Sequence, residues 1–307
     1  MPWTKGETNR IFLSMRSPVN RLRGNHSVTR QVQGVRLTLP RSHMLPVYAR
    51  VKPTYGQNLV ELAAGLAQRL EDNGPLTVLD IGANVGDSAL QIAARTGARV
   101  LCVEADPYWI DYLHRNVDGN DAIAVEEVLL LPEGSAVGTA SAVRDHGTTR
   151  FVEEAGATPA MPMATAAEVR ARNPRFDRLR LVKSDTDGYD PVLVPAAAQA
   201  WADSGPVLFF EFDPELARKA GYDPNAMWPA LMELGYTDLA IWDNAGDALG
   251  QLAIGDAAER AQSLEPKPIE YGYHFWDVAA RRSDDDAAAA VFDALVPHPF
   301  DPRPGVA

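Results

Sequence analysis

The sequence is poor in cysteine, in basic residues and in long apolar runs. Its 307 residues include a single cysteine, Cys102, so neither a disulfide framework nor a cysteine-based zinc site can be built within the chain. Asp and Glu outnumber Lys and Arg by 41 to 29, and the resulting formal net charge of -12 argues against a nucleic-acid-binding surface. An acidic total still leaves room for a local basic pocket.

Long uncharged stretches are also missing. A membrane-spanning helix needs roughly 18 predominantly apolar residues in a row, and the sequence has no such run. Residues 1–24 lack the continuous apolar core of a secretory signal peptide. With 46% hydrophobic and 23% charged residues, the composition is that of an ordinary globular protein. We therefore expect a soluble, cytoplasmic protein that binds neither nucleic acid nor a membrane.

Strand-like and helix-like segments alternate along most of the chain. Short apolar runs predict seven strands, at residues 76–82, 98–106, 122–131, 178–185, 206–213, 237–243 and 273–280. Helical periodicity or helix-capping signals mark residues 57–71, 87–97 and 106–117 between them. This alternation predicts an α/β fold with a doubly wound, mostly parallel, seven-stranded sheet that carries helices on both faces. Ligands of such sheets bind at the carboxyl ends of the strands, where the strand order reverses.

The composition changes near both ends of the chain. Residues 1–55 are rich in Arg, Pro and polar residues and predict an N-terminal arm or cap. Residues 56–282 contain the α/β pattern, and residues 283–307 predict a capped helix followed by a Pro-rich tail. Between residues 132 and 178 we expect a hairpin near residues 132–138 and a helix near residues 165–173, and we assign no chemistry there.

The turn after the first predicted strand, DIGANVG, lacks the features of a phosphate site. A P-loop has a lysine directly after its last glycine, whereas Asp87 follows Gly86 here. A dinucleotide-binding turn has a glycine at the position of Asn84. The carboxylates Asp80 and Asp87 flank the turn and would repel phosphate, so the turn favours a ligand that carries a positive charge.

An acidic residue stands at the end of the second predicted strand. Glu104 follows the glycine turn by about twenty residues, where a carboxylate accepts the hydroxyls of a ribose in doubly wound folds. A cationic ligand with a ribose describes S-adenosylmethionine, and the arrangement resembles class I, Rossmann-like methyltransferases. The predicted cofactor contacts are Asp80, Gly82, Ala83, Asn84, Gly86, Asp87, Ser88, Glu104, Ala105 and Asp185. Alternatively, the glycines only ease a strand-to-helix turn and Glu104 is a solvated loop carboxylate.

A second motif, KSDTDGYD, ends the fourth predicted strand. It resembles the K-x-D-x-[DE]-G-x-[DE] run of FkbM-family methyltransferases, with matches at Lys183, Asp185, Asp187, Gly188 and Asp190. The lead-in at residues 43–63 and VLFFEFDP at residues 207–214 also resemble this family, so the resemblance covers roughly residues 40–282. The family more often has Glu at positions 187 and 190, and it has a polar residue where Leu131 and Pro132 stand.

The resemblance implies an O-methyltransferase that acts on a hydroxyl of a sugar, a surface polysaccharide or a related natural product. Methyl transfer depends mainly on positioning and is helped by a base near the acceptor. We expect Asp185 to position cofactor or acceptor and Asp187 to be a possible base, although Asp187 before Gly188 also fits a plain turn. His274 is a further candidate base, and a half-buried core histidine is its alternative. Lys183, inside a buried strand, is expected to pair structurally with an acid.

Several alternatives stay open at this point. Asp185 and Asp187, with Glu211 or Asp213, could hold Mg²⁺, but an acidic crevice for a cationic cofactor explains the same residues, so we do not favour a metal. The lead-in residues His43, Tyr48 and Tyr55 either close over the ligand or, as we expect for His43, belong to an exposed arm. The rival functions are a nicotinamide-dependent oxidoreductase of similar fold and a non-catalytic cofactor-binding protein.

Overall fold

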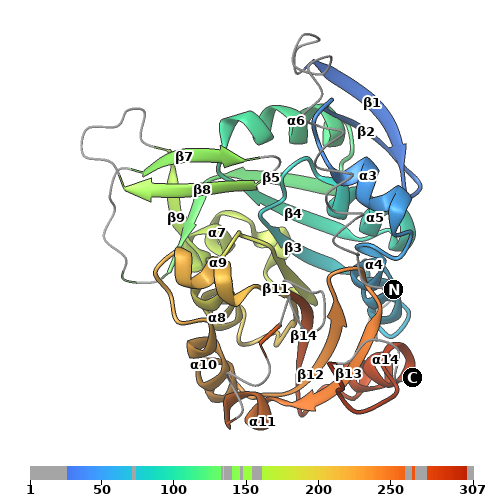
Figure 1. Ribbon diagram of the computed structural model, residues 1–307, viewed down its shortest axis with the longest axis vertical. Coiled ribbons are helices and arrows are strands. Elements are labelled where there is room, and N and C mark those ends of the chain that lie inside the picture. Colours follow the sequence, from blue (N-terminus) through green and yellow to red (C-terminus); the bar gives the residue numbers. More distant parts are fainter. Residues whose placement is uncertain are drawn as a thin grey trace.

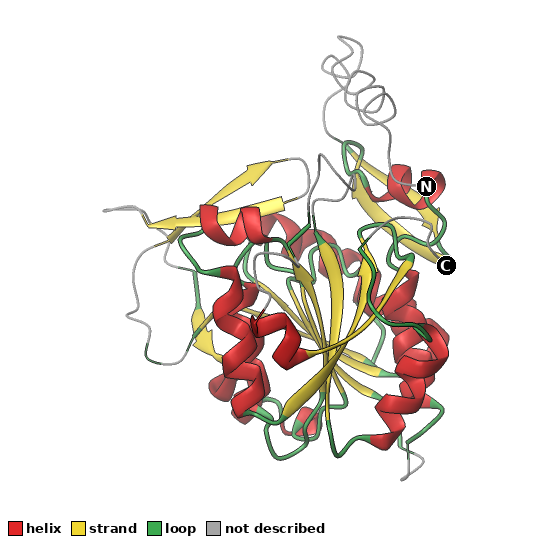
Figure 2. Ribbon diagram, turned by 60° about the horizontal axis from the view of Figure 1, so that its bottom comes forward, coloured by secondary structure: helices red, strands yellow, loops and turns green. Residues whose placement is uncertain are grey.

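A central sheet with helices on both faces forms the body of the protein (Figures 1 and 2). The computed structural model describes residues 26–70, 74–132, 134, 140–145, 148–153, 161–259, 265–266 and 275–302. Among these residues, the sheet has eight strands. In spatial order they are β13 (Ala248–Ala253), β12 (Tyr236–Asp243), β14 (Trp276–Arg282), β11 (Val207–Phe212), β10 (Leu181–Ser184), β3 (Thr77–Ile81), β4 (Arg99–Glu104) and β5 (Ile123–Glu127).

The pairing of these strands confirms the doubly wound α/β prediction. Strands β5, β4, β3, β10 and β11 run parallel to one another, whereas β14 is antiparallel to both β11 and β12. The chain moves outward from β3 to β5 and then returns to β10 on the other side of β3, so the strand order reverses between β3 and β10. The ligand site is therefore predicted at the carboxyl ends of β3 and β10.

The predicted number of strands in the sheet was one too low. Strand β13 pairs antiparallel with β12 at the edge of the sheet. Its sequence, ALGQLA, contains Gly250 at φ +128°, and a glycine inside a strand weakens the apolar pattern by which a strand is recognised. The backbone of Phe300 lies 2.3 Å from where a Cβ of Gly250 would be, which explains the glycine.

Two layers of helices cover the sheet. The helices are α3 (Leu45–Val51), α4 (Gln57–Ala67), α5 (Asp87–Thr96), α6 (Pro107–Val117), α7 (Ala166–Arg172), α8 (Asp190–Ala200), α9 (Pro214–Lys219), α10 (Met227–Glu233), α11 (Ile254–Glu259) and α14 (Asp286–Leu295), with 3-10 turns η1 (Pro174–Phe176) and η2 (Pro224–Ala226). Apolar residues of α4, α5 and α14 share one core with the sheet, and those of α7, α8, α10 and α11 share the core on the opposite face. None of the described helices is long and apolar enough to span a bilayer.

The local signals read from the sequence are confirmed at several helix ends. Asp106 caps α6 by accepting a hydrogen bond from the backbone N–H of Tyr108 at 2.9 Å. Gly97 ends α5 in the left-handed conformation, at φ +71°. The predicted helix near residues 165–173 is α7, and a capping box between Thr165 and Glu168 starts it.

The region after the third predicted strand differs from the prediction. The run at residues 122–131 is broken at Val128 into β5 and β6 (Leu129–Leu131), because β6 leaves the sheet and pairs with β9 (Met163–Thr165). A hairpin of β7 (Ala140–Asp145) and β8 (Thr148–Glu153) follows. Most of residues 132–138, where a hairpin is predicted, lie outside the described residues.

An N-terminal hairpin, β1 (Ser27–Val32) and β2 (Val35–Pro40), packs on α6. Leu37 and Leu39 of β2 are fully buried in a cluster that includes Trp109 and Tyr112 of α6. The side chain of Asn116 accepts from the N–H of Thr38 at 2.6 Å and donates to the carbonyls of Thr38 and Val85. The hairpin is therefore bonded to the glycine turn that precedes α5.

Candidate active site

Residues at one end of six adjacent strands form one row on the α4 face of the sheet, at the carboxyl ends of β4, β3, β10, β11 and β12 and at the amino end of the antiparallel β14. Asp80 pairs in register with Cys102 and Lys183, and Lys183 pairs with Phe209. Since alternate residues of a strand share a face, the residues two positions further on also lie side by side. We call this set the strand-end row; its members are Glu104, Gly82, Asp185, Glu211, Asp277 and Trp242, the last two being paired directly in register.

The glycine turn has the backbone that the sequence predicts. Gly82 has φ +72°, and a Cβ added there would lie 2.0 Å from the carbonyl oxygen of Asp185. Gly86 has φ +81°, and its Cβ would lie 2.7 Å from Leu113 Cδ1. Asn84 is also left-handed, at φ +50°, a conformation that Asn tolerates better than most residues. Packing alone thus requires both glycines, as the alternative interpretation proposed for them.

Glu104 is not the solvated loop carboxylate of the alternative interpretation. It is 8% exposed, and its carboxylate accepts three backbone N–H bonds, from Asn84 at 2.8 Å and from Ala105 and Asp106 at 2.9 Å. Burial raises the pKa of Glu104, and these three bonds oppose the rise. A carboxylate has about four lone-pair positions, so roughly one remains, on the oxygen that contacts Asn84.

A buried ion pair lies beneath the row. Lys183 Nζ is 2.9 Å from Asp80 Oδ1, and Lys183 also donates to the carbonyl of Gly82 at 3.0 Å. Burial opposes the charge of Lys183, but the carboxylates of Asp80 and Asp185 raise its pKa well above the usual value, so it stays charged. The structural pairing predicted for Lys183 is confirmed. Asp80 has no exposed surface and is paired with Lys183, and its contact with a cofactor stays a prediction.

The motif after β10 separates into exposed and buried carboxylates. The side chain of Asp185 is 49% exposed at the row and 4.0 Å from Lys183 Nζ. Asp187 has φ +52° in a turn that Gly188 completes at φ +106°, so its backbone is that of the plain-turn alternative, and its role as base stays a prediction. Asp190 is buried, accepts from the Ser184 hydroxyl at 2.6 Å, and has its pKa raised by burial to about 6.

The remaining predicted cofactor residues line the turn and the adjoining helix. Ala83 and Ala105 are buried, whereas Ser88 is half-buried near the start of α5. Asp87, the first residue of α5, has its pKa raised by burial to about 6. His274 lies outside the described residues. Among the described residues, no three His, Cys, Asp or Glu side chains are arranged to hold a metal ion.

Sequence analysis missed one carboxylate of the row, Asp277. It lies on the antiparallel strand β14 opposite Glu211, and its Oδ2 accepts a hydrogen bond from Asn58 Nδ2 of α4 at 2.7 Å. Burial raises the pKa of Asp277 to about 7, and it raises that of Glu211 well above the usual value, with further contributions from nearby carboxylates, Asp185 first. The only signal for Asp277 in the sequence was an acidic residue inside an apolar strand. The antiparallel pairing that places it opposite Glu211 has no local sequence pattern.

Two lead-in residues also reach the site, which corrects the expectation that His43 belongs to an exposed arm. Its Nδ1 accepts the backbone N–H of Leu45 at 3.2 Å, so the proton of the neutral ring lies on Nε2, 3.3 Å from Asn84 Oδ1. Burial lowers the pKa of His43. Burial raises the pKa of Tyr55 far above its usual value, and the charges of Asp185 and Glu211 add to this, so its phenol stays protonated.

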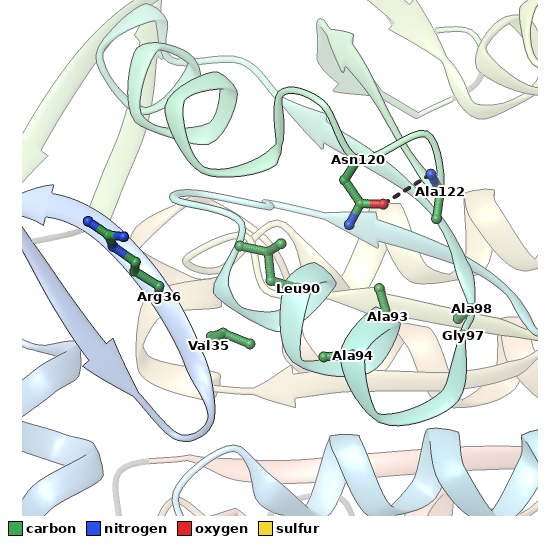
Figure 3. A pocket seen from close by; sticks show the side chains of 9 residues that line it. All are labelled: Val35, Arg36, Leu90, Ala93, Ala94, Gly97, Ala98, Asn120 and Ala122. Carbon is green, nitrogen blue, oxygen red and sulfur yellow. Dashed lines mark hydrogen bonds between the residues drawn. The ribbon is translucent and has the colours of Figure 1, made fainter.

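A cavity of about 290 Å³ lies between α5 and β2, near the amino ends of β4 and β5 (Figure 3). Its wall comes from β2, α5 and the segments that precede β4 and β5; the residues are Val35, Arg36, Leu90, Ala93, Ala94, Gly97, Ala98, Asn120 and Ala122. Arg36 is its single ionisable side chain, and Asn120 is bonded to the N–H of Ala122. The cavity therefore offers no acid–base chemistry, and the strand-end row is the better candidate site.

Comparison with known proteins gives similarity of structure alone. No family model matches the sequence, and no curated protein matches it. Solved structures of similar fold include Pyrococcus horikoshii TYW2 in complex with MeSAdo, with 13% identity, a TM-score of 0.43, and coverage of 85% of this chain and 73% of that one. An O-methyltransferase from Bacillus cereus in complex with SAH has 12% identity, a TM-score of 0.37, and coverage of 72% and 80%.

A third structure of this kind is the precorrin-6y C5,15-methyltransferase from Geobacter metallireducens, with 12% identity, a TM-score of 0.37, and coverage of 73% of this chain and 86% of that one. At such identities and scores the similarity concerns the arrangement of strands and helices. The chemistry of the residues has to carry the assignment of a function.

Proposed function

We propose that the chain is an S-adenosylmethionine-dependent O-methyltransferase that acts on a hydroxyl of a sugar, a surface polysaccharide or a related natural product. The observation that carries this proposal is the cluster of carboxylates near the carboxyl end of β3. The half-buried or exposed carboxylates of Asp87, Asp185, Glu211 and Asp277 gather there, and the lysine of the same face is bound to Asp80. Such a cluster of carboxylates favours a cationic ligand.

The residues present fit this cofactor. Glu104 and the turn at residues 82–86 would hold its nucleoside end, because the remaining lone pair of Glu104 accepts one ribose hydroxyl. Asp87 and Asp185 would attract its positively charged groups. When bound, the cofactor supplies a methyl group on a positively charged sulfur. The chain's own residues orient the acceptor and receive its proton, and correct orientation alone can lower a barrier by about 7 to 11 kcal/mol.

The choice of a hydroxyl acceptor rests on the resemblance of residues 183–190 to the FkbM motif. A neutral hydroxyl needs a base when it attacks, and carboxylates stand at the row to provide one. The nicotinamide alternative is disfavoured on charge, since its pyrophosphate would face Asp87 and Asp185 without the glycine that a dinucleotide turn has at position 84.

Titration calorimetry with S-adenosylmethionine and S-adenosylhomocysteine tests the proposal. We expect micromolar to submillimolar binding to the unmodified protein and at least about a tenfold loss in Glu104→Gln, because one cofactor hydrogen bond to a charged group is worth about 1.5 to 3 kcal/mol. Glu127→Gln is the matched control. Glu127 of β5 pairs in register with Glu104 of β4, but the side chain of Glu127 is 54% exposed.

Because Glu104 also holds three backbone N–H groups, the unfolding transition of each variant has to be recorded as well. No heat with either ligand at millimolar concentration, or equal affinity in Glu104→Gln, would contradict the proposal. Binding without any S-adenosylhomocysteine formed from a panel of hydroxyl acceptors would favour the non-catalytic alternative.

A further inference from the structure

Three carboxylates stand side by side on three neighbouring strands. Asp185 follows β10, Glu211 is on β11 and Asp277 is on β14, and these strands are adjacent in the sheet. Glu211 and Asp277 are direct cross-strand partners, which puts their Cβ atoms about 4.5 to 5.5 Å apart. Like charges in that position destabilise a sheet, so the pair has a strong tendency to keep a proton.

The charges around the pair do not neutralise it. Among the described residues, neither Glu211 nor Asp277 forms an ion pair, and Lys183 of the same face is held by Asp80 at 2.9 Å. The titratable groups that face the pair are Asp185 and Asp187 after β10, Asp213 after β11, Asp243 at the end of β12, Tyr55 from the lead-in and Lys183 on β10. Burial and these carboxylates raise the pKa of Asp277 to about 7 and that of Glu211 well above its usual value.

A buried amide beside the pair points to a ligand that donates hydrogen bonds. Asn58 of α4 is 7% exposed and its Nδ2 donates to Asp277 Oδ2 at 2.7 Å. Its Oδ1 is also buried and accepts no hydrogen bond from the described residues. A buried acceptor without a partner destabilises the folded protein, and a hydroxyl that donated to it would remove that penalty. The two carboxylates and Asn58 Oδ1 are therefore all acceptors that a hydrogen-bond donor of a ligand would satisfy.

Resting on the proposed methyltransferase function, we propose that the Glu211–Asp277 pair binds the acceptor hydroxyl and takes its proton, and that the acceptor is a neutral polyol rather than a phosphorylated or carboxylated molecule. The pair replaces Asp187 as the base. Asp187 lies in a tight turn, whereas the pair combines two facing carboxylates with a neighbouring donor, Asn58.

The step balances as follows. The acceptor O–H bond breaks and its proton goes to a carboxylate oxygen of the pair, which starts with one proton and ends with two. A lone pair of the acceptor oxygen forms the new C–O bond to the methyl carbon. The electrons of the C–S bond that breaks return to sulfur, which becomes a neutral thioether. The pair then releases one proton to solvent.

Carbon-13 NMR of protein labelled at the Asp and Glu side-chain carboxyls tests the shared proton. We expect a carboxyl signal that titrates near pH 7 in the unmodified protein and in the control Glu127→Gln. This titration should vanish in Asp277→Asn and move to lower pH in Glu211→Gln, because Asp277 stays buried there but no longer faces a second carboxylate. Titration of both carboxyls below pH 5, or an unchanged signal near pH 7 in both variants, would overturn the proposal.

A second measurement tests the acceptor class. With S-adenosylhomocysteine present, methyl α-glucoside serves as the neutral probe and glucose 6-phosphate as the anionic probe. We expect only the neutral sugar to shift the carboxyl signals of Glu211 and Asp277. No shift with the neutral sugar, or equal shifts with both, would overturn it. Binding of S-adenosylhomocysteine to the unmodified protein is measured separately. If it does not bind, the proposed function itself fails, whereas binding without a shift by the neutral sugar overturns only this proposal.

Discussion

The ion pair between Lys183 and Asp80 allows a sharp prediction about what holds the site together. The two side chains are 7% and 0% exposed, and Lys183 also donates to the carbonyl of Gly82. Lys183→Met keeps most of the side-chain volume but leaves the Asp80 carboxylate buried without its cation. Breaking a buried pair in this way costs about 3 to 5 kcal/mol, so we expect a loss of that size in the free energy of unfolding at pH 8.

The loss should depend on pH with a definite sign. Burial already raises the pKa of Asp80, and Lys183 opposes that rise. Without Lys183 the pKa rises further, and a carboxyl with a raised pKa in the folded state loses stability as pH rises through that value. The difference between Lys183→Met and the unmodified protein should therefore shrink as pH falls from 8 toward 5. Urea unfolding followed by tryptophan fluorescence measures it.

Two further variants make this prediction refutable. Lys219→Met removes an exposed i,i+4 partner of Glu215 and should cost less than about 1 kcal/mol. Adding Asp80→Leu to Lys183→Met removes the orphaned charge and should restore most of the lost stability. A loss below about 1 kcal/mol in Lys183→Met, or a double variant no more stable than the single one, would refute the reasoning.

Two other predictions concern backbone strain and titration. Gly82→Ala should cost about 3 kcal/mol or more in thermal or urea unfolding, because its Cβ meets the Asp185 carbonyl at 2.0 Å, whereas Gly97→Ala, with open space and φ +71°, should cost only about 1 to 2 kcal/mol. Asp190, with its pKa raised to about 6, should weaken the fold by about 3 kcal/mol as pH rises from 4 through 6. Asp190→Asn should flatten that part of the stability profile; equal slopes would contradict it.

Much of the fold could be predicted because its signals are local. The strand that ends at Gly82, the cap at Asp106 and the stop at Gly97 each depend on residues that are close in the sequence. The doubly wound arrangement follows from the alternation of such elements. Edge strand β13 was missed because Gly250 interrupts its pattern, and the need for that glycine comes from the distant residue Phe300.

The site was predicted in part for the same reason. Glu104 follows the turn in the next strand, so its place beside Asn84 could be inferred from strand alternation. The pairing of Glu211 with Asp277 depends on an antiparallel register that no local pattern encodes. The contact between His43 and Asn84 joins residues 41 positions apart, and only the packing of the hairpin on α6 brings them together.

The bonds of Asn116 have a consequence for any truncation of the chain before the glycine turn. One amide side chain ties Thr38 of the hairpin to Val85 inside the glycine turn. A truncation that removed the hairpin would uncover Trp109 and Tyr112 of α6 and leave the Asn116 side chain bonded to Val85 without its two bonds to Thr38. A change on the outer surface of α6 would in this way reach a turn at the centre of the sheet.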